Sequence, residues 1–169
     1  KYGHFDRADA TSGETLAETA LVRNSGCISC PIRCERRVMV DGREVKGPEY
    51  ETLGLFGANI DADNMEMILK LNYLSDDLGL DTISLASTIA FAMELKEHGM
   101  ADFGVEFGRV DNLPEVVEKI AHREGIYSEL ANGSKWLSEK YGGKEFAMHS
   151  KGLEMASYEP RRSVGMGLG

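Results

Sequence analysis

The sequence has few cysteines, and they are too few and too clustered for a disulfide framework. Its 169 residues include only three, Cys27, Cys30 and Cys34, within eight consecutive positions. An odd, clustered set of this kind is typical of a metal site. Three interpretations stay open: a 4Fe-4S cluster with its fourth ligand outside these residues, a zinc site with a distant fourth ligand, and a Cys-x-x-Cys redox pair with Cys34 as a bystander.

Basic residues are also scarce. Lys and Arg number 19 against 28 for Asp and Glu, which gives a formal net charge of -9. An acidic chain is poorly suited to bind a nucleic-acid backbone or an anionic membrane surface, so neither is expected as the main partner.

Long apolar runs are missing as well. No run approaches the length of a membrane-spanning helix, and no signal-peptide pattern opens the chain, so we expect a cytoplasmic protein without membrane insertion. The sequence does not begin with Met, and it ends on a glycine-spaced run. We therefore expect a fragment of a larger multidomain protein.

The apolar residues that are present predict a mostly α-helical fold. Helical spacing covers the segments 12–23, 63–78, 81–98, 113–124, 127–132 and 134–141. Asp63 and Glu66 resemble a capping box at the second of these helices, and Asp81 is the expected N-cap of the third.

One small β-hairpin is predicted after the cysteines. Asp41-Gly42 favours a type I′ turn between two short flanking segments, 37–40 and 43–45. Residues 46–54 follow, with two glycines and one proline, and they are predicted to form a stiff loop that presents Glu49 and Glu51. On composition alone, this loop is a solvated acidic turn.

An acidic junction separates the second and third predicted helices. The segment 75–82 places Asp76, Asp77 and Asp81 beside the start of a helix. Free backbone amides point outward there, so carboxylates and amides together could hold a polar ligand.

Four motifs in this order resemble the aldehyde:ferredoxin oxidoreductase family. They are Gly26-Cys27-x-x-Cys30-Pro31-x-x-Cys34, Gly47-Pro48-Glu49-Tyr50-Glu51, Asp76-x-x-Gly79-Leu80-Asp81, and Lys151-Gly152-Leu153-Glu154-Met155 with Pro160-Arg161. The resemblance runs from about residue 24 to residue 169. It implies a helical middle domain over residues 1–145 and the entry to a C-terminal domain over residues 146–169.

The resemblance implies specific residue roles. Cys27, Cys30 and Cys34 match three ligands of a 4Fe-4S cluster, and the fourth is expected beyond this chain. Glu51 matches the carboxylate beside the metal, which assists proton movement. The residues that match pterin contacts are Asp76, Gly79, Leu80 and Asp81, followed by Lys151, Glu159 and Arg161.

The implied cofactors are a 4Fe-4S cluster and a tungsten or molybdenum bis-pterin. The implied reaction oxidises a small aldehyde to a carboxylic acid and passes electrons to ferredoxin, in an enzyme that includes the rest of the parent chain and is compatible with a homodimer. Two alternatives stay open: a related reductase of aromatic thioesters or another carbonyl substrate, and a non-catalytic cysteine-rich metal-binding module. The segment alone is expected to be inactive.

Overall fold

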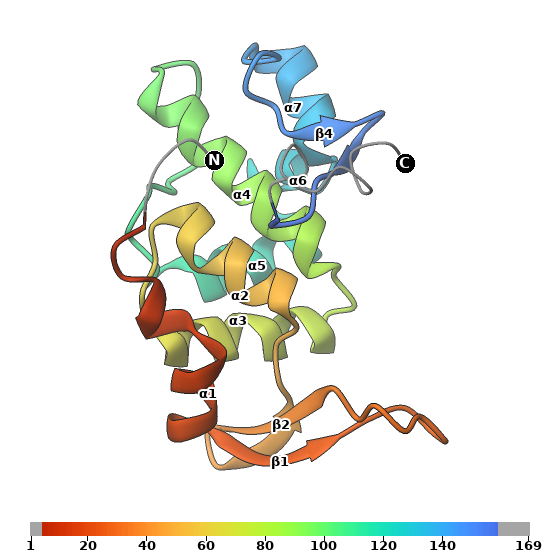
Figure 1. Cartoon of the computed structure of the whole chain (residues 1–169). Coiled ribbons are helices and arrows are strands. Elements are labelled where there is room, and N and C mark those ends of the chain that lie inside the picture. The colour runs from red at the N-terminus through yellow and green to blue at the C-terminus, as the bar shows by residue number, and fades with distance from the viewer. Residues whose placement is uncertain (1–4, 159–169) are drawn as a thin grey trace.

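The computed structural model describes residues 5–158, and these form a mostly helical structure as predicted. A helical body stands above a small antiparallel sheet in Figure 1, with α4 running through its centre. The main core includes Phe56, Ile89, Met93 and Leu137, and a smaller cluster that includes Leu16 and Val38 lies where the sheet meets the helices.

The N-terminal helix is shorter than the sequence predicts. A 3-10 turn, Ala8–Thr11, leads into α1, Gly13–Thr19, and Ser12 caps α1 by accepting a hydrogen bond from the Thr15 amide. The predicted continuation of this helix is wrong, because Leu21–Ser25 forms strand β1. Leu21 lies opposite Val38 and packs into the smaller cluster, so pairing with a distant strand outweighs the helical spacing.

The predicted hairpin is present, and β1 extends it to three strands. Strands β2, Glu35–Val40, and β3, Arg43–Lys46, pair antiparallel, and the sheet order is β1-β2-β3. Asp41 and Gly42 both have positive φ, at 47° and 76°, as the turn type requires.

Residues 46–54 are not a loop throughout, which corrects the prediction. Helix α2, Tyr50–Phe56, begins directly after Pro48 and Glu49, and Thr52, Leu55 and Phe56 are buried. Glu51 therefore lies in the first turn of a helix, where the helix dipole favours a carboxylate. A short 3-10 turn, Ala58–Ile60, follows.

Helices α3, Met65–Asp77, and α4, Thr82–Glu97, are close to their predicted bounds. The N-cap of α3 is Asn64, whose side chain accepts from the Met67 amide at 3.0 Å, so the predicted Asp63 cap is wrong by one position. Asp63 instead pairs with Arg7 at 3.0 Å. The predicted Asp81 cap of α4 is confirmed, since its carboxylate accepts from the Ser84 amide at 2.7 Å.

Three more helices complete the body. They are α5, Leu113–Ala121, which ends before the predicted residue 124, α6, Tyr127–Leu130, and α7, Gly133–Tyr141. The chain then makes a two-stranded hairpin of β4, His149–Ser150, and β5, Leu153–Glu154. Strand β5 packs against α4 and α7, and the boundary at residue 145 stays a prediction.

Between residues 5 and 158, no single helix is both long and apolar enough to cross a membrane. Only α3 and α4 taken together pass such a test, and they are bent by 119° at their junction.

Candidate functional site

The three cysteines lie on the loop that joins β1 to β2, which projects from the sheet in Figure 1. All three are free thiols; Cys27 and Cys34 are exposed and Cys30 is half-buried. The Cys30 amide donates to the Cys27 carbonyl at 3.1 Å, which closes a tight turn between the first two thiols. The loop thus offers three accessible sulfur donors.

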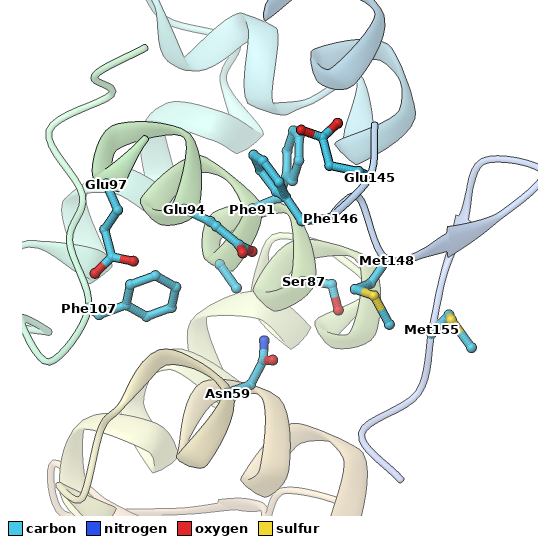
Figure 2. Close-up of a pocket in the computed structure, with 11 residues that line it drawn as sticks. Asn59, Ser87, Phe91, Glu94, Glu97, Phe107, Glu145, Phe146, Met148 and Met155 are labelled. Carbon is cyan, nitrogen blue, oxygen red and sulfur yellow. The ribbon is translucent and has the colours of Figure 1, made fainter. Parts of the chain in front are cut away.

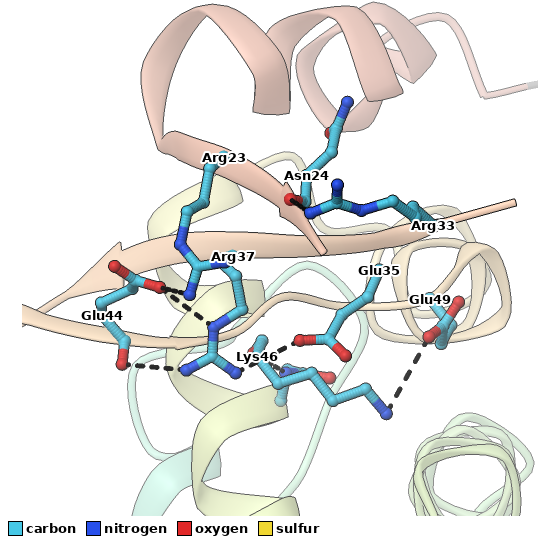
Figure 3. Close-up of polar contacts among 9 residues, drawn as sticks. Arg23, Asn24, Arg33, Glu35, Arg37, Glu44, Lys46 and Glu49 are labelled. Carbon is cyan, nitrogen blue, oxygen red and sulfur yellow. Dashed lines mark hydrogen bonds and ion pairs between the residues drawn. The ribbon is translucent and has the colours of Figure 1, made fainter. Parts of the chain in front are cut away.

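Close backbone packing holds the base of this loop together. A Cβ on Gly26 would lie 2.8 Å from the Arg33 Cα, so only glycine allows the two sides of the loop to approach this closely. Arg36 donates to the Cys34 carbonyl at 2.7 Å. Arg33 donates to the Asn24 carbonyl at 3.5 Å, as Figure 3 shows.

Charged pairs stiffen the strands that carry the loop. Arg37 lies between Glu35 and Glu44, at 3.3 Å from an oxygen of each, and Arg23 reaches Glu44 at 2.7 Å (Figure 3). The two pairs of Glu44 cross from β3 to β2 and β1, whereas the Arg37–Glu35 pair lies within β2, so the Glu44 pairs support the register of the strands that carry the loop.

The cysteines are not gathered into a metal site in the described part of the chain. No group of three or more His, Cys, Asp or Glu side chains within residues 5–158 could hold a metal ion. The donor set nevertheless suits iron, because soft thiolates are the usual ligands of iron–sulfur clusters. The metal-ligand role of Cys27, Cys30 and Cys34 stays a prediction.

The sheet is joined directly to the helix that carries Glu51. The Gly47 amide donates to the Arg36 carbonyl, and a Cβ on Gly47 would lie 2.7 Å from that same oxygen. The Asn72 side chain on α3 donates to the Lys46 carbonyl at 3.0 Å. The start of α2 is therefore held against the strand that follows Cys34.

A cleft connects these two elements. Cys34, Arg36, Glu49 and Tyr50 line a cavity of about 540 Å³ together with residues of α1. The last thiol of the cysteine loop and the first turn of α2 thus share one open space.

Glu51 meets a residue that the sequence did not single out. Its carboxylate accepts a hydrogen bond from the Ser157 backbone amide at 2.5 Å, across 106 positions of sequence. The second sequence motif therefore meets the segment that lies between the two parts of the fourth motif. The Ser157 hydroxyl is buried without a hydrogen-bond partner among the described residues, which suits a site that receives a polar ligand group.

The acidic junction between α3 and α4 is built from two helix caps. The Leu80 amide donates to the Ser75 carbonyl at 2.8 Å and the Gly79 amide to the Asp76 carbonyl at 3.2 Å, as in a Schellman motif. Gly79 has φ of 68°, which glycine adopts without strain. Gly79 and Asp81 therefore have structural roles whether or not they also bind a ligand.

The junction is open to solvent in the described chain. Asp76, Gly79 and Asp81 are exposed and Leu80 is half-buried. Thr52 on α2 and Thr82 at the start of α4 share a hydrogen bond at 2.8 Å, which ties the Glu51 helix to this junction. The pterin-binding role of the four residues stays a prediction.

The C-terminal motif divides into an exposed turn and a buried anchor. Lys151 is exposed at the tip of the β4–β5 hairpin with φ of 55°. Glu154 is buried, and its carboxylate accepts from the amide and the hydroxyl of Ser134, both at 2.8 Å. Glu159 and Arg161 lie outside the described residues, so their predicted roles are not placed.

A second cavity lies between α4 and the C-terminal segment (Figure 2). It has a volume of about 270 Å³ and is lined by aromatic rings, methionine sulfurs and carboxylates, among them Phe91, Phe146, Met155 and Glu94. Burial raises the pKa of Glu94, and nearby His98 opposes this shift.

The fold and site define a mostly helical segment that carries a three-thiol loop and a helix-borne carboxylate on one rigid scaffold. All 169 residues match the family model described as "Aldehyde ferredoxin oxidoreductase, domains 2 & 3". The chain therefore belongs to the aldehyde ferredoxin oxidoreductase family, as the sequence motifs had predicted.

Individual relatives agree with this membership. The tungsten-containing aldehyde ferredoxin oxidoreductase of Pyrococcus furiosus is 43% identical over 99% of this chain, and the chain spans 29% of that protein. The WOR-like subunit of an aliphatic sulfonate oxidoreductase of the same organism is 29% identical over 80% of this chain and is matched over 24% of its length.

A solved structure shows the same fold. The active site complex BamBC of benzoyl coenzyme A reductase, in complex with 1,5-dienoyl-CoA, aligns with a TM-score of 0.73 and 24% identity. The alignment covers 93% of this chain and 25% of the solved chain.

Proposed function

We propose that this chain is the segment of a cytoplasmic tungsten-pterin, iron–sulfur oxidoreductase that supplies three cluster ligands and the carboxylate beside the tungsten. The parent enzyme oxidises aldehydes to carboxylic acids and passes the electrons to ferredoxin. The observation that carries this proposal is the contact of Glu51 with Ser157, because it joins one family motif to a segment, 106 positions away, that lies between the two parts of another. The tungsten-containing relative, 43% identical, supports the choice of metal.

The residues of this chain divide the work by their chemistry. Cys27, Cys30 and Cys34 bind iron through their thiolates, and the fourth ligand comes from the rest of the parent chain. Asp76 and Asp81 accept hydrogen bonds from amino groups of a pterin. Lys151, Glu159 and Arg161 are assigned to the same cofactor by their motif, and the cofactor supplies the two-electron redox chemistry.

The overall reaction converts an aldehyde and one water into a carboxylic acid, two electrons and two protons. A cluster bound by Cys27, Cys30 and Cys34 would supply the route by which the electrons reach the carrier. Glu51 accepts and releases a proton at the substrate with the carboxylate oxygen that is not bound by Ser157. A helix-borne carboxylate with one oxygen fixed is suited to this task, because general acid–base catalysis requires hydrogen-bond geometry.

Glu51→Gln in the anaerobically purified full-length enzyme tests the catalytic assignment. We expect kcat for aldehyde-dependent dye reduction to fall by about 100-fold or more, with tungsten and iron content unchanged. Glu66→Gln is the matched control, since Glu66 is an exposed carboxylate in the first turn of another helix, α3. Full turnover in Glu51→Gln would contradict the assignment.

Cys30→Ser tests the cluster assignment in the same preparation. We expect loss of iron and of visible iron–sulfur absorption while tungsten is retained. Ile28→Ser is the control, because Ile28 is 99% exposed on the same loop and carries no thiol. Zinc in place of iron and tungsten would instead support the non-catalytic metal-binding module.

A related reaction on another substrate is the second candidate. The similarity to an aliphatic sulfonate oxidoreductase subunit supports this second candidate. Most of the residues described here are assigned to cofactor binding, so they do not select the substrate. Turnover with a sulfonate or an aromatic thioester, but with no aldehyde, would replace the aldehyde assignment while leaving the site residues in place.

A further inference from the structure

Ser157 contacts the Glu51 side chain through its backbone and not through its hydroxyl. The amide donates to the Glu51 Oε2 atom at 2.5 Å, whereas the Ser157 Oγ atom is buried with no partner among the described residues. A backbone donor has no side-chain rotamers, so it fixes the carboxylate oxygen at one place as long as the segment itself does not move.

Gly54 makes this contact geometrically possible. It lies three positions after Glu51 in α2, and residues with this spacing are neighbours on one face of a helix. A Cβ on Gly54 would lie 2.8 Å from both the Cβ and the Oγ of Ser157. Glycine inside a helix costs about 0.5–1 kcal/mol relative to alanine, and the close approach of Ser157 gives this glycine a reason.

Glu154 anchors the same segment three positions earlier. Its buried carboxylate binds Ser134 at the start of α7 and lies 3.5 Å from the Thr88 hydroxyl on α4. The chain from Glu154 to Ser157 is thus held at both ends, on α7 and on α2. Because Glu154 anchors this segment, the Ser157 amide cannot move together with Glu51 if a change at the contact separates α2 from residues 154–157.

We propose that Ser157 is a positioning residue for Glu51, whose backbone amide holds one carboxylate oxygen in the catalytic orientation. The absence of a side chain at Gly54 lets Ser157 approach closely enough to do so. This inference rests on the proposed function, because it takes Glu51 as the residue that moves a proton. A misplacement of about 1 Å near a reacting group can lower a rate by about 100-fold, so a small shift should be measurable.

The experiment compares Gly54→Ala, Glu51→Asp and the double variant in the full-length holoenzyme, with acetaldehyde as substrate and a viologen dye as acceptor. Glu51→Asp keeps a carboxylate but is too short to retain the Ser157 contact. We expect each single variant to lower kcat by about 10- to 100-fold with KM changed less than about threefold and metal content unchanged. The double variant should be no more than about twofold slower than the slower single variant, because both changes remove the same contact.

Gly13→Ala is the matched control, since a Cβ on Gly13, at the start of α1, meets nothing within 4 Å. If Gly54→Ala does not load its metals, Ser157→Pro removes the same amide donor without changing α2, and the same loss of kcat is expected. Multiplicative losses in the double variant, or wild-type kcat in Gly54→Ala or in a metal-loaded Ser157→Pro, would overturn the positioning role.

The catalytic role of Glu51 and the positioning role of Ser157 can be refuted separately. If Glu51→Gln turns over normally, the proposed function of Glu51 fails and the positioning role fails with it. If Glu51→Gln is inactive but the Gly54 and Glu51→Asp losses multiply, only the positioning role fails.

Discussion

Glu154→Ala should lower the local free energy of unfolding at the start of α7, by an amount that follows from two hydrogen bonds. The Glu154 carboxylate is 7% exposed and accepts two hydrogen bonds of 2.8 Å from Ser134, one from the amide and one from the hydroxyl. Hydrogen bonds to a charged group contribute about 1.5–3 kcal/mol each, so losing both should cost about 3 kcal/mol or more. Asn132, the residue at the N-cap position of α7, makes no side-chain cap hydrogen bond that could replace them.

Native-state amide hydrogen exchange at Ser134 in the full-length protein measures this cost locally. A loss of about 3 kcal/mol corresponds to exchange faster by about 100-fold, since each factor of ten is about 1.4 kcal/mol. Glu154→Gln should restore most of the protection, because its amide oxygen can still accept from Ser134, although without charge. Glu139→Ala is the control, since Glu139 is an exposed glutamate on the same helix.

Two results would contradict a capping role for the Glu154 carboxylate. Unchanged exchange at Ser134 in Glu154→Ala would show that the carboxylate does not cap α7. Equal damage from Glu154→Gln and Glu154→Ala would show that side-chain volume, and not hydrogen bonding, holds the segment.

Three further predictions concern other parts of the fold. Asp81→Ala should lower the free energy of unfolding of α4 by about 1 kcal/mol, which faster exchange of the Ser84 amide would show. Asp81→Asn should recover most of this free energy, and unchanged exchange in Asp81→Ala would argue against the cap. Burial raises the pKa of Glu94, so its contribution to stability is present below its unfolded pKa and is lost as pH rises through the raised pKa. Glu94→Gln should therefore raise the melting temperature over wild type more at about pH 8 than at about pH 4. An equal rise at both pH values would contradict the shift. Gly133→Ala should destabilise α7 by about 1 kcal/mol or more in the same exchange assay, because Gly133 has φ of 83° and an added Cβ would lie 3.0 Å from the Glu154 carboxylate. Wild-type protection from exchange would show that the backbone and Glu154 adapt to the added Cβ.

Local chemistry in the sequence predicted several elements correctly. Asp41-Gly42 indicated the hairpin turn, and Asp81 indicated the start of α4. Each of these signals depends on the backbone preference or the side-chain reach of one or two residues, so it can be recognised without knowing the tertiary structure.

Elements that depend on distant partners were predicted less well. Strand β1 forms because Leu21 lies opposite Val38, and the spacing of its neighbours had indicated a helix. Helix α2 was not predicted, because Pro48 and two carboxylates indicated a loop. Pro48 lies just before the start of this helix, and the burial of Phe56 stabilises it. Tertiary burial decided both cases.

The candidate site shows the same division between local and distant information. Glu51 was identified by its motif, but its partner Ser157 could not be, because a backbone amide leaves no trace in side-chain identity. A glycine inside a short helix, Gly54, was the one available signal of a close approach at that face. Glu154 belonged to a recognised motif, yet its role as the cap of α7 depends on a contact with Ser134 across 20 positions.

These contacts also bear on how the cysteine loop and Glu51 can work as one unit. The strand after Cys34 binds Gly47 through the Arg36 carbonyl, Gly47 leads through Pro48 into α2, and α2 is held to α4 by the hydrogen bond of Thr52. These steps are a backbone hydrogen bond, a short chain connection, a short packed helix and a hydrogen bond between two threonine hydroxyls, and none passes through a long exposed side chain. A displacement of the loop base must therefore move the start of α2, which gives the chain a physical means of keeping its sulfur donors and its carboxylate at a constant separation.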